Sequence, residues 1–340
     1  MVASIYHMNF LQAIVIGLIQ GFTELFPISS LGHTVLIPSW IGSTWGILVR
    51  QESLAESPYL AFIVGLHLAT ALVLLGFYLR EWIRLIRGFF RTIATGRVET
   101  PEERLAWLIV IATIPVGILG VALEHEFRVL FAKPEAAAVF LMINGLILFA
   151  GEWAVRRNEG RTLAGATSSR RGVLSGAAIG GNPGHPAGPP AGRYRRFRDE
   201  RIVPMDEEAE RQLSGIGAPS AGIIGTAQAL ALLAGISREG VAMVGGLFRG
   251  LNRENAMRFS FLLSTPVILL AGLYKIPSDL LGSVGAGTRA QILVGSVAAA
   301  ASSLAAIIFL SQYFKTRTLK PFAIYSLLFG LASVIRFGVF

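Results

Sequence analysis

Residues 21–33 read Gly-Phe-Thr-Glu-Leu-Phe-Pro-Ile-Ser-Ser-Leu-Gly-His. They interrupt an apolar stretch, 9–40, with ionisable side chains and with residues that break helices. A continuous membrane helix would place Glu24 in hydrocarbon, at a cost of roughly 2.5–3.5 kcal/mol. Non-helical backbone at that depth is tolerated only where it is buried in protein or lines a wet cavity. The stretch therefore predicts a re-entrant helix–loop–helix hairpin.

A second apolar stretch, 216–248, is broken in the same way and reads Gly-Ile-Ser-Arg-Glu-Gly at 235–240. Six residues recur between the two stretches at a constant offset of 208: Ile16 and Ile224, Gly17 and Gly225, Gln20 and Gln228, Ile28 and Ile236, Ser29 and Ser237, Gly32 and Gly240. Each broken stretch is followed by three long apolar segments. Because three is odd, the second half enters the membrane upside down. We therefore expect an inverted-topology repeat whose broken helices meet near the midplane.

Six apolar segments are long enough to cross a bilayer, which takes about 20 residues: 59–79, 105–123, 136–155, 256–274, 290–312 and 321–340. The predicted fold is an all-α polytopic membrane protein with six transmembrane helices and two re-entrant hairpins. It has three parts. Residues 1–155 form the first repeat and 214–340 the second. Between them, 156–213 form a Gly/Pro/Arg-rich cytoplasmic loop, disordered except for a short acidic helix near 206–213.

Composition supports this fold class. The chain is 53% hydrophobic and 15% charged, whereas soluble domains carry roughly 25% charged residues. Cysteine is absent, which excludes disulfides, zinc–thiolate sites, iron–sulfur clusters and catalytic thiols. The net charge of +9 does not indicate a nucleic-acid partner, because basic residues of membrane proteins gather in cytoplasmic loops beside anionic lipid. Segments 80–104, 156–213 and 315–320 hold 20 Lys and Arg, against 5 on the opposite side, so these segments are expected in the cytoplasm.

The polar residues inside the two hairpins can form an anion-binding and catalytic site. Gln20 and Glu24 are four residues apart and share one helical face, and a carboxylate suits Mg²⁺ or Ca²⁺. A hydroxyl of Ser29 or Ser30 can attack phosphorus if a base takes its proton, and His33 is a candidate base. Arg238 offers a fork of donors for phosphate oxygens. Backbone N–H groups near Gly235 and Gly240 can add to the anion site.

Each of these residues also has a structural interpretation. Glu24 and Arg238 can form an ion pair that only neutralises charge inside the membrane, and Glu239 can balance Arg238. The serines Ser29, Ser30 and Ser237 can cap helices or join them. His33 and His67 can be satisfied interior histidines.

Residues 21–33 resemble the first signature of the undecaprenyl-diphosphatase family of bacitracin-resistance proteins. Residues 235–240 are similar to its second signature, Pro-Gly-x-Ser-Arg-Ser-Gly, and Phe259–Pro266 and Pro321–Tyr325 are similar to other family segments. The resemblance covers nearly the whole chain apart from 156–213. It implies a cell-membrane hydrolase that converts undecaprenyl diphosphate to undecaprenyl phosphate and inorganic phosphate. This reaction recycles the lipid carrier of cell-wall synthesis and confers resistance to bacitracin.

The resemblance also implies roles for single residues and a site that opens toward the outer face. Glu24 would help to bind a divalent cation, Mg²⁺ or Ca²⁺. Ser30 would be the nucleophile and His33 its acid/base partner. Arg238 would clamp the phosphates, with support from Ser29 and Ser237.

The chain departs from the family pattern at Gln20, Ala234, Glu239 and Ala242. The family usually has Glu where Gln20 stands, so one carboxylate of a Glu-x-x-x-Glu pair is missing. Glu239 replaces the second Ser of the other signature. We expect Glu239 to supply the missing carboxylate from the second hairpin, which makes the expected metal ligands Glu24, Gln20 and Glu239.

One rival function remains open on this evidence. Inverted repeats with broken helices are also a transporter architecture, so a polyprenyl-phosphate transporter or flippase is the alternative. A purely structural scaffold gives no reason for Glu, His and Arg at membrane depth. A homodimer is compatible with the sequence.

Overall fold

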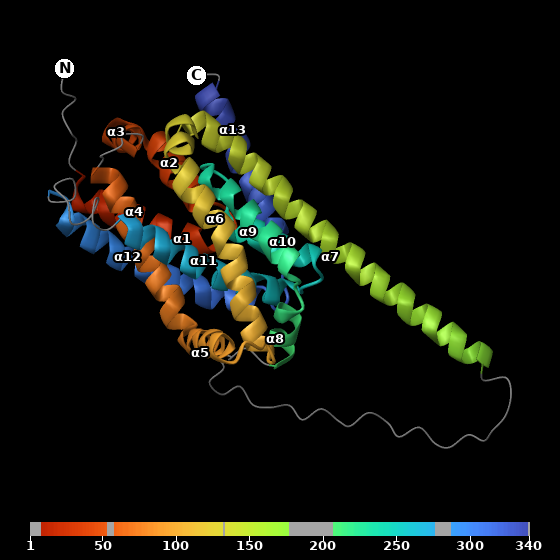
Figure 1. Ribbon diagram of the computed structural model, residues 1–340. Helices are drawn as coiled ribbons and strands as arrows, with labels where there is room; N and C mark the ends of the chain where they lie inside the picture. The colour runs from red at the N-terminus through yellow and green to blue at the C-terminus, as the bar shows by residue number, and fades with distance from the viewer. Residues whose placement is uncertain (1–7, 53–57, 132, 177–206, 276–286, 339–340) are drawn as a thin grey trace, which may run out of the picture.

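The computed structural model describes residues 8–52, 58–131, 133–176, 207–275 and 287–338 (Figure 1). Every regular element in these ranges is helical. In chain order the elements are α1 (Phe10–Leu25), α2 (Ser30–Ile41), α3 (Ser43–Glu52), α4 (Pro58–Phe77), α5 (Leu79–Thr95), α6 (Pro101–Phe131), α7 (Pro134–Gly176), α8 (Glu207–Ser214), α9 (Ala218–Ala227), the 3₁₀ helix η1 (Gln228–Leu232), α10 (Arg238–Phe248), α11 (Arg253–Lys275), α12 (Arg289–Tyr313) and α13 (Lys320–Gly338).

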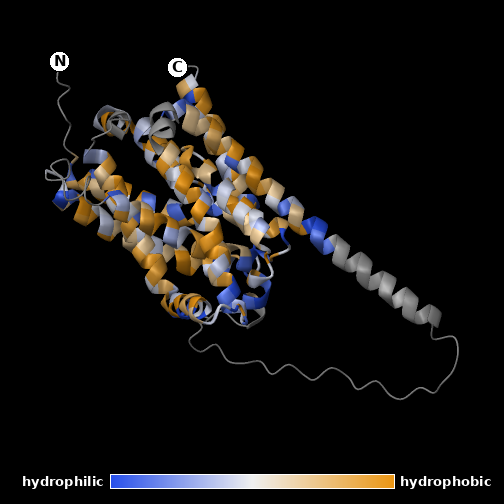
Figure 2. Ribbon diagram, in the orientation of Figure 1, coloured by the Kyte–Doolittle hydropathy of each residue, from blue (hydrophilic) through white to orange (hydrophobic). Residues whose placement is uncertain are grey.

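Within the described ranges, six helices are long and apolar enough to cross a membrane: Pro58–Phe77, Pro101–Leu123, Pro134–Glu159, Arg253–Lys275, Arg289–Tyr313 and Lys320–Gly338. They coincide with the six predicted spans, which are therefore confirmed. Hydrophobic residues dominate the bundle that these helices form (Figure 2). The chain is thus a multi-pass membrane protein.

The first broken stretch folds as α1 and α2. Asn9 begins α1 with a capping box that it shares with Gln12. The chain leaves the helix at Phe26, and Ser29 then caps α2 by accepting a hydrogen bond from the Gly32 N–H. With 16 and 12 residues, α1 and α2 measure roughly 24 and 18 Å, less than a hydrocarbon core of about 30 Å.

The second broken stretch folds as α9, η1 and α10, and Gly235 lies at its break with φ of +113°. A Cβ atom at Gly235 would lie 2.4 Å from the Ala137 carbonyl oxygen, so only glycine fits this position. Ser237 then caps α10 by accepting a hydrogen bond from the Gly240 N–H.

In each broken stretch, a hydrogen bond joins residues near its start to residues just after its end. The Gln12 Nε2 atom donates to the Thr44 hydroxyl at 3.3 Å, which joins the start of α1 to the residues after α2. The Asn255 Nδ2 atom donates to the Gln212 Oε1 atom at 2.8 Å, which joins the residues on either side of α9–α10. These bonds support the hairpin paths. The membrane depth of the hairpins and their inverted relation stay predictions.

The helices pair closely across the two halves of the sequence. α1 packs along α12, and α13 packs along α7, as Figure 1 shows for the second pair. At Gly21 an added Cβ would lie 2.1 Å from the Ala299 carbonyl oxygen, so glycine permits the close approach of α1 to α12.

The predicted loop 156–213 differs from the structure at its start. Helix α7 continues past residue 155 to Gly176 instead of ending there. This extension contains Ala, Leu, Arg and Glu, which favour helix, and its charged residues allow it to leave the apolar layer. The short acidic helix expected near 206–213 is confirmed as α8. Residues 177–206 lie outside the described part of the chain.

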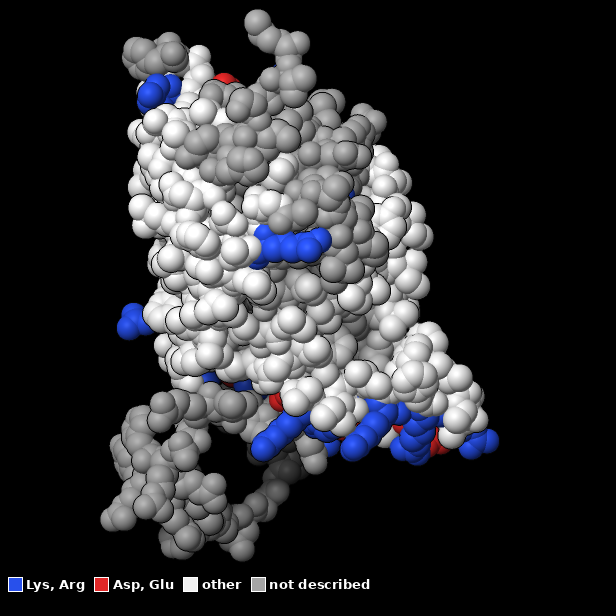
Figure 3. All heavy atoms as spheres, turned by 90° about the vertical axis from the view of Figure 1, so that its left-hand side faces the viewer, with Lys and Arg blue, Asp and Glu red and all other residues white. Residues whose placement is uncertain are grey.

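Basic side chains gather along one end of the molecule, the lower end in Figure 3. Helix α5 contributes Arg80, Arg84, Arg87 and Arg91 from one side. Its other side exposes large apolar residues: Leu79, Ile83, Ile86, Phe90 and Ile93. Such an amphipathic helix is typical of one that lies in the membrane interface.

Candidate active site

The Glu24 carboxylate is the centre of a buried polar cluster at the end of α1. Its Oε2 atom accepts a short hydrogen bond from the Ser30 hydroxyl and a 3.4 Å bond from Gln20 Nε2. The same oxygen lies 3.1 Å from Nε2 of His67, which α4 contributes. Glu24 is 3% exposed, so these neighbours replace the water that would otherwise solvate its charge. The first hairpin therefore holds a hydroxyl directly against a carboxylate.

Arg238 brings the second hairpin to this cluster. It is the first residue of α10, and its Nη1 atom lies 3.8 Å from Glu24 Oε1. This distance is too long for a hydrogen bond, and Nη1 has no hydrogen-bond partner among the described residues. A partly buried guanidinium whose buried Nη1 atom has a free donor is well suited to an anion that enters the site.

The breaks of the two hairpins are in direct contact. The Ser29 hydroxyl accepts hydrogen bonds from the N–H groups of Gly32 and Gly235, at 3.2 and 3.1 Å. Ser29 has φ of +72°, a costly conformation for a residue with a side chain. Strain held in this way is common where a fold fixes a functional turn, and here it positions the adjacent Ser30.

Asn144, from the membrane-spanning part of α7, links the two breaks a second time. Its Nδ2 atom donates to the Pro27 carbonyl at 2.8 Å, and its Oδ1 atom accepts from the Ser237 N–H at 3.0 Å. The side chain is fully buried. One amide therefore satisfies a backbone acceptor of the first break and a backbone donor of the second.

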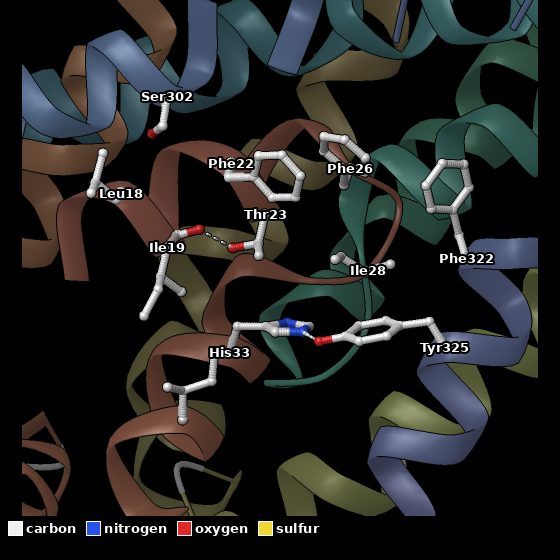
Figure 4. Close-up of a pocket in the computed structure, with 11 residues that line it drawn as sticks. Leu18, Ile19, Phe22, Thr23, Phe26, Ile28, His33, Ser302, Phe322 and Tyr325 are labelled. Atoms are coloured by element: carbon white, nitrogen blue, oxygen red, sulfur yellow. Dashed lines mark hydrogen bonds between the residues drawn. The ribbon is translucent and has the colours of Figure 1, made fainter. Parts of the chain in front are cut away.

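His33 has partners for both ring nitrogens. Nδ1 lies 2.6 Å from the Ser29 carbonyl oxygen and therefore carries the hydrogen, while Nε2 lies 2.8 Å from the Tyr325 hydroxyl (Figure 4). The His33 and Tyr325 rings are also stacked, with centroids 5.6 Å apart. The Ser30 hydroxyl donates its hydrogen bond to Glu24, and the two His33 nitrogens bond to Ser29 and Tyr325 instead of Ser30.

The structure thus brings together several of the predicted residues. Glu24, Ser30, Gln20 and Arg238 converge, and Glu239 lies close enough to Glu24 for their charges to interact. Ser29 and Ser237 act as caps, and they engage the N–H groups of Gly235 and Gly240 that were expected to face an anion. The roles assigned to all of these residues stay predictions.

Four neighbours of the cluster were not among the predicted site residues: His67, Thr70, Asn144 and Tyr325. The Thr70 hydroxyl lies 3.2 Å from Gln20 Oε1 and orients that amide. His67 and Asn144 could have been found from a simple signal, because each is a strongly polar residue inside an otherwise apolar span. Tyr325 carries no such polarity signal, but it lies in Pro321–Tyr325, a segment that resembles part of the family pattern.

The buried cluster contains some of the oxygen ligands that a hard cation needs. Oε1 of buried Glu239 has no hydrogen-bond partner among the described residues, and Oε1 of Glu24 has only the distant Arg238. The described residues contain no group of three or more His, Asp or Glu that could hold a metal ion. Mg²⁺ often takes only one or two carboxylates and completes its shell with water and substrate phosphates. The two carboxylates of Glu24 and Glu239 fit this mode.

Comparison with known proteins places this geometry in context. The family model described as bacitracin resistance protein BacA matches residues 13–181 and 196–332. A Frankia alni protein named undecaprenyl-diphosphatase 2 is 50% identical over 98% of this chain and 99% of its own length. A Mycolicibacterium paratuberculosis protein named undecaprenyl-diphosphatase is 46% identical over 97% of both chains. A Chromobacterium violaceum protein named undecaprenyl-diphosphatase 2 is 35% identical over 96% of this chain and 99% of its own.

Proposed function

The chain belongs to the bacitracin resistance protein BacA family, and from this premise we propose that it is an undecaprenyl-diphosphatase. It hydrolyses undecaprenyl diphosphate to undecaprenyl phosphate and inorganic phosphate, and so returns the lipid carrier to cell-wall synthesis. The observation that carries this function is the Ser30 hydroxyl, which donates to the Glu24 carboxylate beside Arg238. In this proposal Ser30 is the nucleophile, Glu24 is its base and Arg238 is the phosphate-binding cation, and the two hairpins supply them together.

In the proposed reaction Glu24 takes the proton of Ser30 as the Ser30 oxygen bonds to the terminal phosphorus. The bond from that phosphorus to the bridging oxygen breaks, and undecaprenyl phosphate departs. Water then attacks the phosphoseryl group. The water oxygen and one water proton leave with the phosphate, and the other water proton restores the Ser30 hydroxyl. The proton on Glu24 leaves with the products. Direct attack by water is the alternative, and trapping phosphoserine at Ser30 would distinguish the two routes.

Arg238 and a divalent cation would stabilise the negative charge of the diphosphate. The free donor of Arg238 binds a phosphate oxygen in a site with little water, where electrostatic interactions are strong. Mg²⁺ or Ca²⁺ would be held by Glu24 and Glu239, with Gln20 beside them, and would neutralise the diphosphate. His33 is proposed to assist proton movement. Its bond to the Ser29 carbonyl also fixes the turn that carries Ser30.

The proposed location is the bacterial cell membrane, with the site open toward the outer face. The basic end in Figure 3, where Figure 1 places α5 and α8, would face the cytoplasm by the positive-inside rule. The first hairpin then enters from the opposite, outer side. The homodimer that is compatible with the sequence stays a prediction.

The direct test is release of inorganic phosphate from undecaprenyl diphosphate by the purified protein. We expect release by the wild type and loss of at least about 100-fold in Ser30→Ala and Arg238→Ala. A protein that binds or moves the lipid without producing phosphate would be the transporter of the rival hypothesis. That result would contradict the proposed function.

A further inference from the structure

Helix α5 has three sides with different surroundings. Glu81, Leu85 and Thr92 are buried against the rest of the protein. A second side is an apolar stripe that is exposed, formed by Leu79, Ile83, Ile86, Phe90 and Ile93. The third side carries the four arginines of the helix, and basic side chains accordingly form a row along the lower end of the molecule in Figure 3. Two of the three sides are therefore available to a partner outside the chain.

Contacts with α6 and α8 fix the rotation of α5 about its axis. The Trp107 Nε1 atom of α6 donates to the Thr92 hydroxyl at 2.8 Å, and the centroids of the Trp107 and Phe89 rings are 4.9 Å apart. The Arg84 guanidinium forms an ion pair with the buried Glu210 carboxylate of α8. Because rotation would break these contacts, the apolar stripe and the arginines keep their exposed positions.

The four arginines form two pairs that differ in their partners. Arg84 is bound to α8, and the Nη2 atom of Arg91 lies 3.2 Å from Glu99 Oε2. Arg80 and Arg87 are exposed, and among the described residues none forms an ion pair or a hydrogen bond with either guanidinium. Two cations of one helix thus have no counter-charge in the described part of the protein.

The two arginines without partners are also the two beside the apolar stripe. At 3.6 residues per turn, Arg87 and Arg80 lie about 40° and 60° from Ile83 around the helix axis. Arg91 and Arg84 lie about 80° and 100° from Ile83. On a helix in the membrane interface, an apolar stripe contacts acyl chains and the cations at its edge lie at the depth of the headgroups.

We propose that this edge of α5 binds anionic phospholipids, with Arg80 and Arg87 on the headgroup phosphates and the apolar stripe against the acyl chains. A guanidinium matches the oxygens of a phosphate with paired donors. A zwitterionic phospholipid carries its own cation, which offsets this attraction, so the site selects lipids with net negative charge. The surface lies outside the candidate active site, and the inference does not depend on the proposed function.

The test is the apparent Kd of the purified full chain for single lipid molecules, measured by native mass spectrometry. Arg80→Gln with Arg87→Gln should weaken the tightest phosphatidylglycerol binding about 30-fold and leave phosphatidylcholine binding unchanged. Arg97→Gln with Arg104→Gln is the matched control, because these exposed arginines of the same end flank no apolar stripe, and phosphatidylglycerol binding should persist. Equal losses in the two double variants, or no loss in the first, would overturn the proposal. Equal thermal unfolding in detergent checks that both variants fold.

A second measurement uses the unaltered protein in vesicles. Phosphatidylglycerol with a photoactivatable group beside its headgroup should label residues 79–93, and the same group on phosphatidylcholine should label them much less. An excess of soluble glycerol phosphate should not prevent the labelling, since it has no acyl chains for the apolar stripe. Labelling of α5 that is equal for the two lipids, or that soluble glycerol phosphate abolishes, would refute a phospholipid site.

Discussion

At the scale of single residues, Glu24 makes the contacts that define the site. One of its oxygens meets Ser30, Gln20 and His67, and the other faces Arg238. Buried carboxylates require such partners, because desolvation of an isolated charge is costly. Removal of any one partner therefore changes the contacts that Glu24 makes with the other partners as well.

Glu239 stands where the family pattern has Ser, and this difference leads to a prediction about metal dependence. Glu239 is 2% exposed, and its Oε1 atom is free of hydrogen bonds within the described part of the chain. Glu239→Ala removes one of two carboxylates and should abolish the Mg²⁺ or Ca²⁺ dependence of phosphate release, or shift it to higher concentration. Glu239→Asp, as the matched control, keeps the charge and should retain the dependence. An unchanged metal titration in purified Glu239→Ala would show that Glu239 is no ligand.

At the scale of elements, the two hairpin breaks depend on α7. Asn144→Ala leaves the Pro27 carbonyl and the Ser237 N–H without their shared partner, at a cost of about 1–3 kcal/mol for each buried group. Thermal unfolding in detergent should therefore begin at a lower temperature, and phosphatase activity should fall. Asn158→Ala on the same helix removes a bond to Leu247 that lies away from the breaks, and it should retain activity. Equal activity of the two variants would contradict the linking role.

Helix α8 carries a pH-sensitive contact outside the membrane. Burial, together with the nearby charge of Glu102, raises the pKa of Glu210 to about 7 despite the Arg84 guanidinium beside it. A carboxyl whose folded-state pKa lies above its ordinary value of 4.5 stabilises the fold in its protonated form. That contribution is complete below about pH 4.5 and is lost as the pH rises through 7.

This contact can be followed with a fluorophore on a single cysteine at Arg211, since the native chain has none. The labelled Arg211→Cys protein should show loosening of α8 between pH 5 and pH 8. Glu210→Gln, which cannot ionise, should show no change over that interval. A flat signal from the labelled Arg211→Cys protein with Glu210 intact would argue against the raised pKa.

The elements also show what a sequence can and cannot predict. The six spans and the two breaks follow from local patterns, because apolar length and helix-breaking residues act where they stand. The partners of His67 and Asn144 depend on which helix face points inward. Tyr325 meets His33 across 292 positions of sequence, so their contact depends on how α13 packs. Tertiary packing of this kind leaves little trace in one sequence.

At the scale of the whole molecule, orientation can be measured with single cysteines. Ser43→Cys should react with a membrane-impermeant maleimide in intact cells. Thr95→Cys at the basic end should react only after the membrane is disrupted. Gly217→Cys and Arg249→Cys flank the second broken stretch and should both behave like Thr95→Cys. If these two positions label from opposite sides, the stretch crosses the membrane and the predicted inverted repeat is wrong.

The central claim is that two hairpins, far apart in sequence, form one catalytic site. A double-mutant cycle on kcat/KM for undecaprenyl diphosphate, with Glu24→Gln, Arg238→Gln and the double variant, tests it most directly. Because Arg238 and Glu24 lie 3.8 Å apart, we predict that each single variant loses at least about 100-fold and that the double variant loses little more. Losses that multiply independently, or full activity without Arg238, would contradict a shared site.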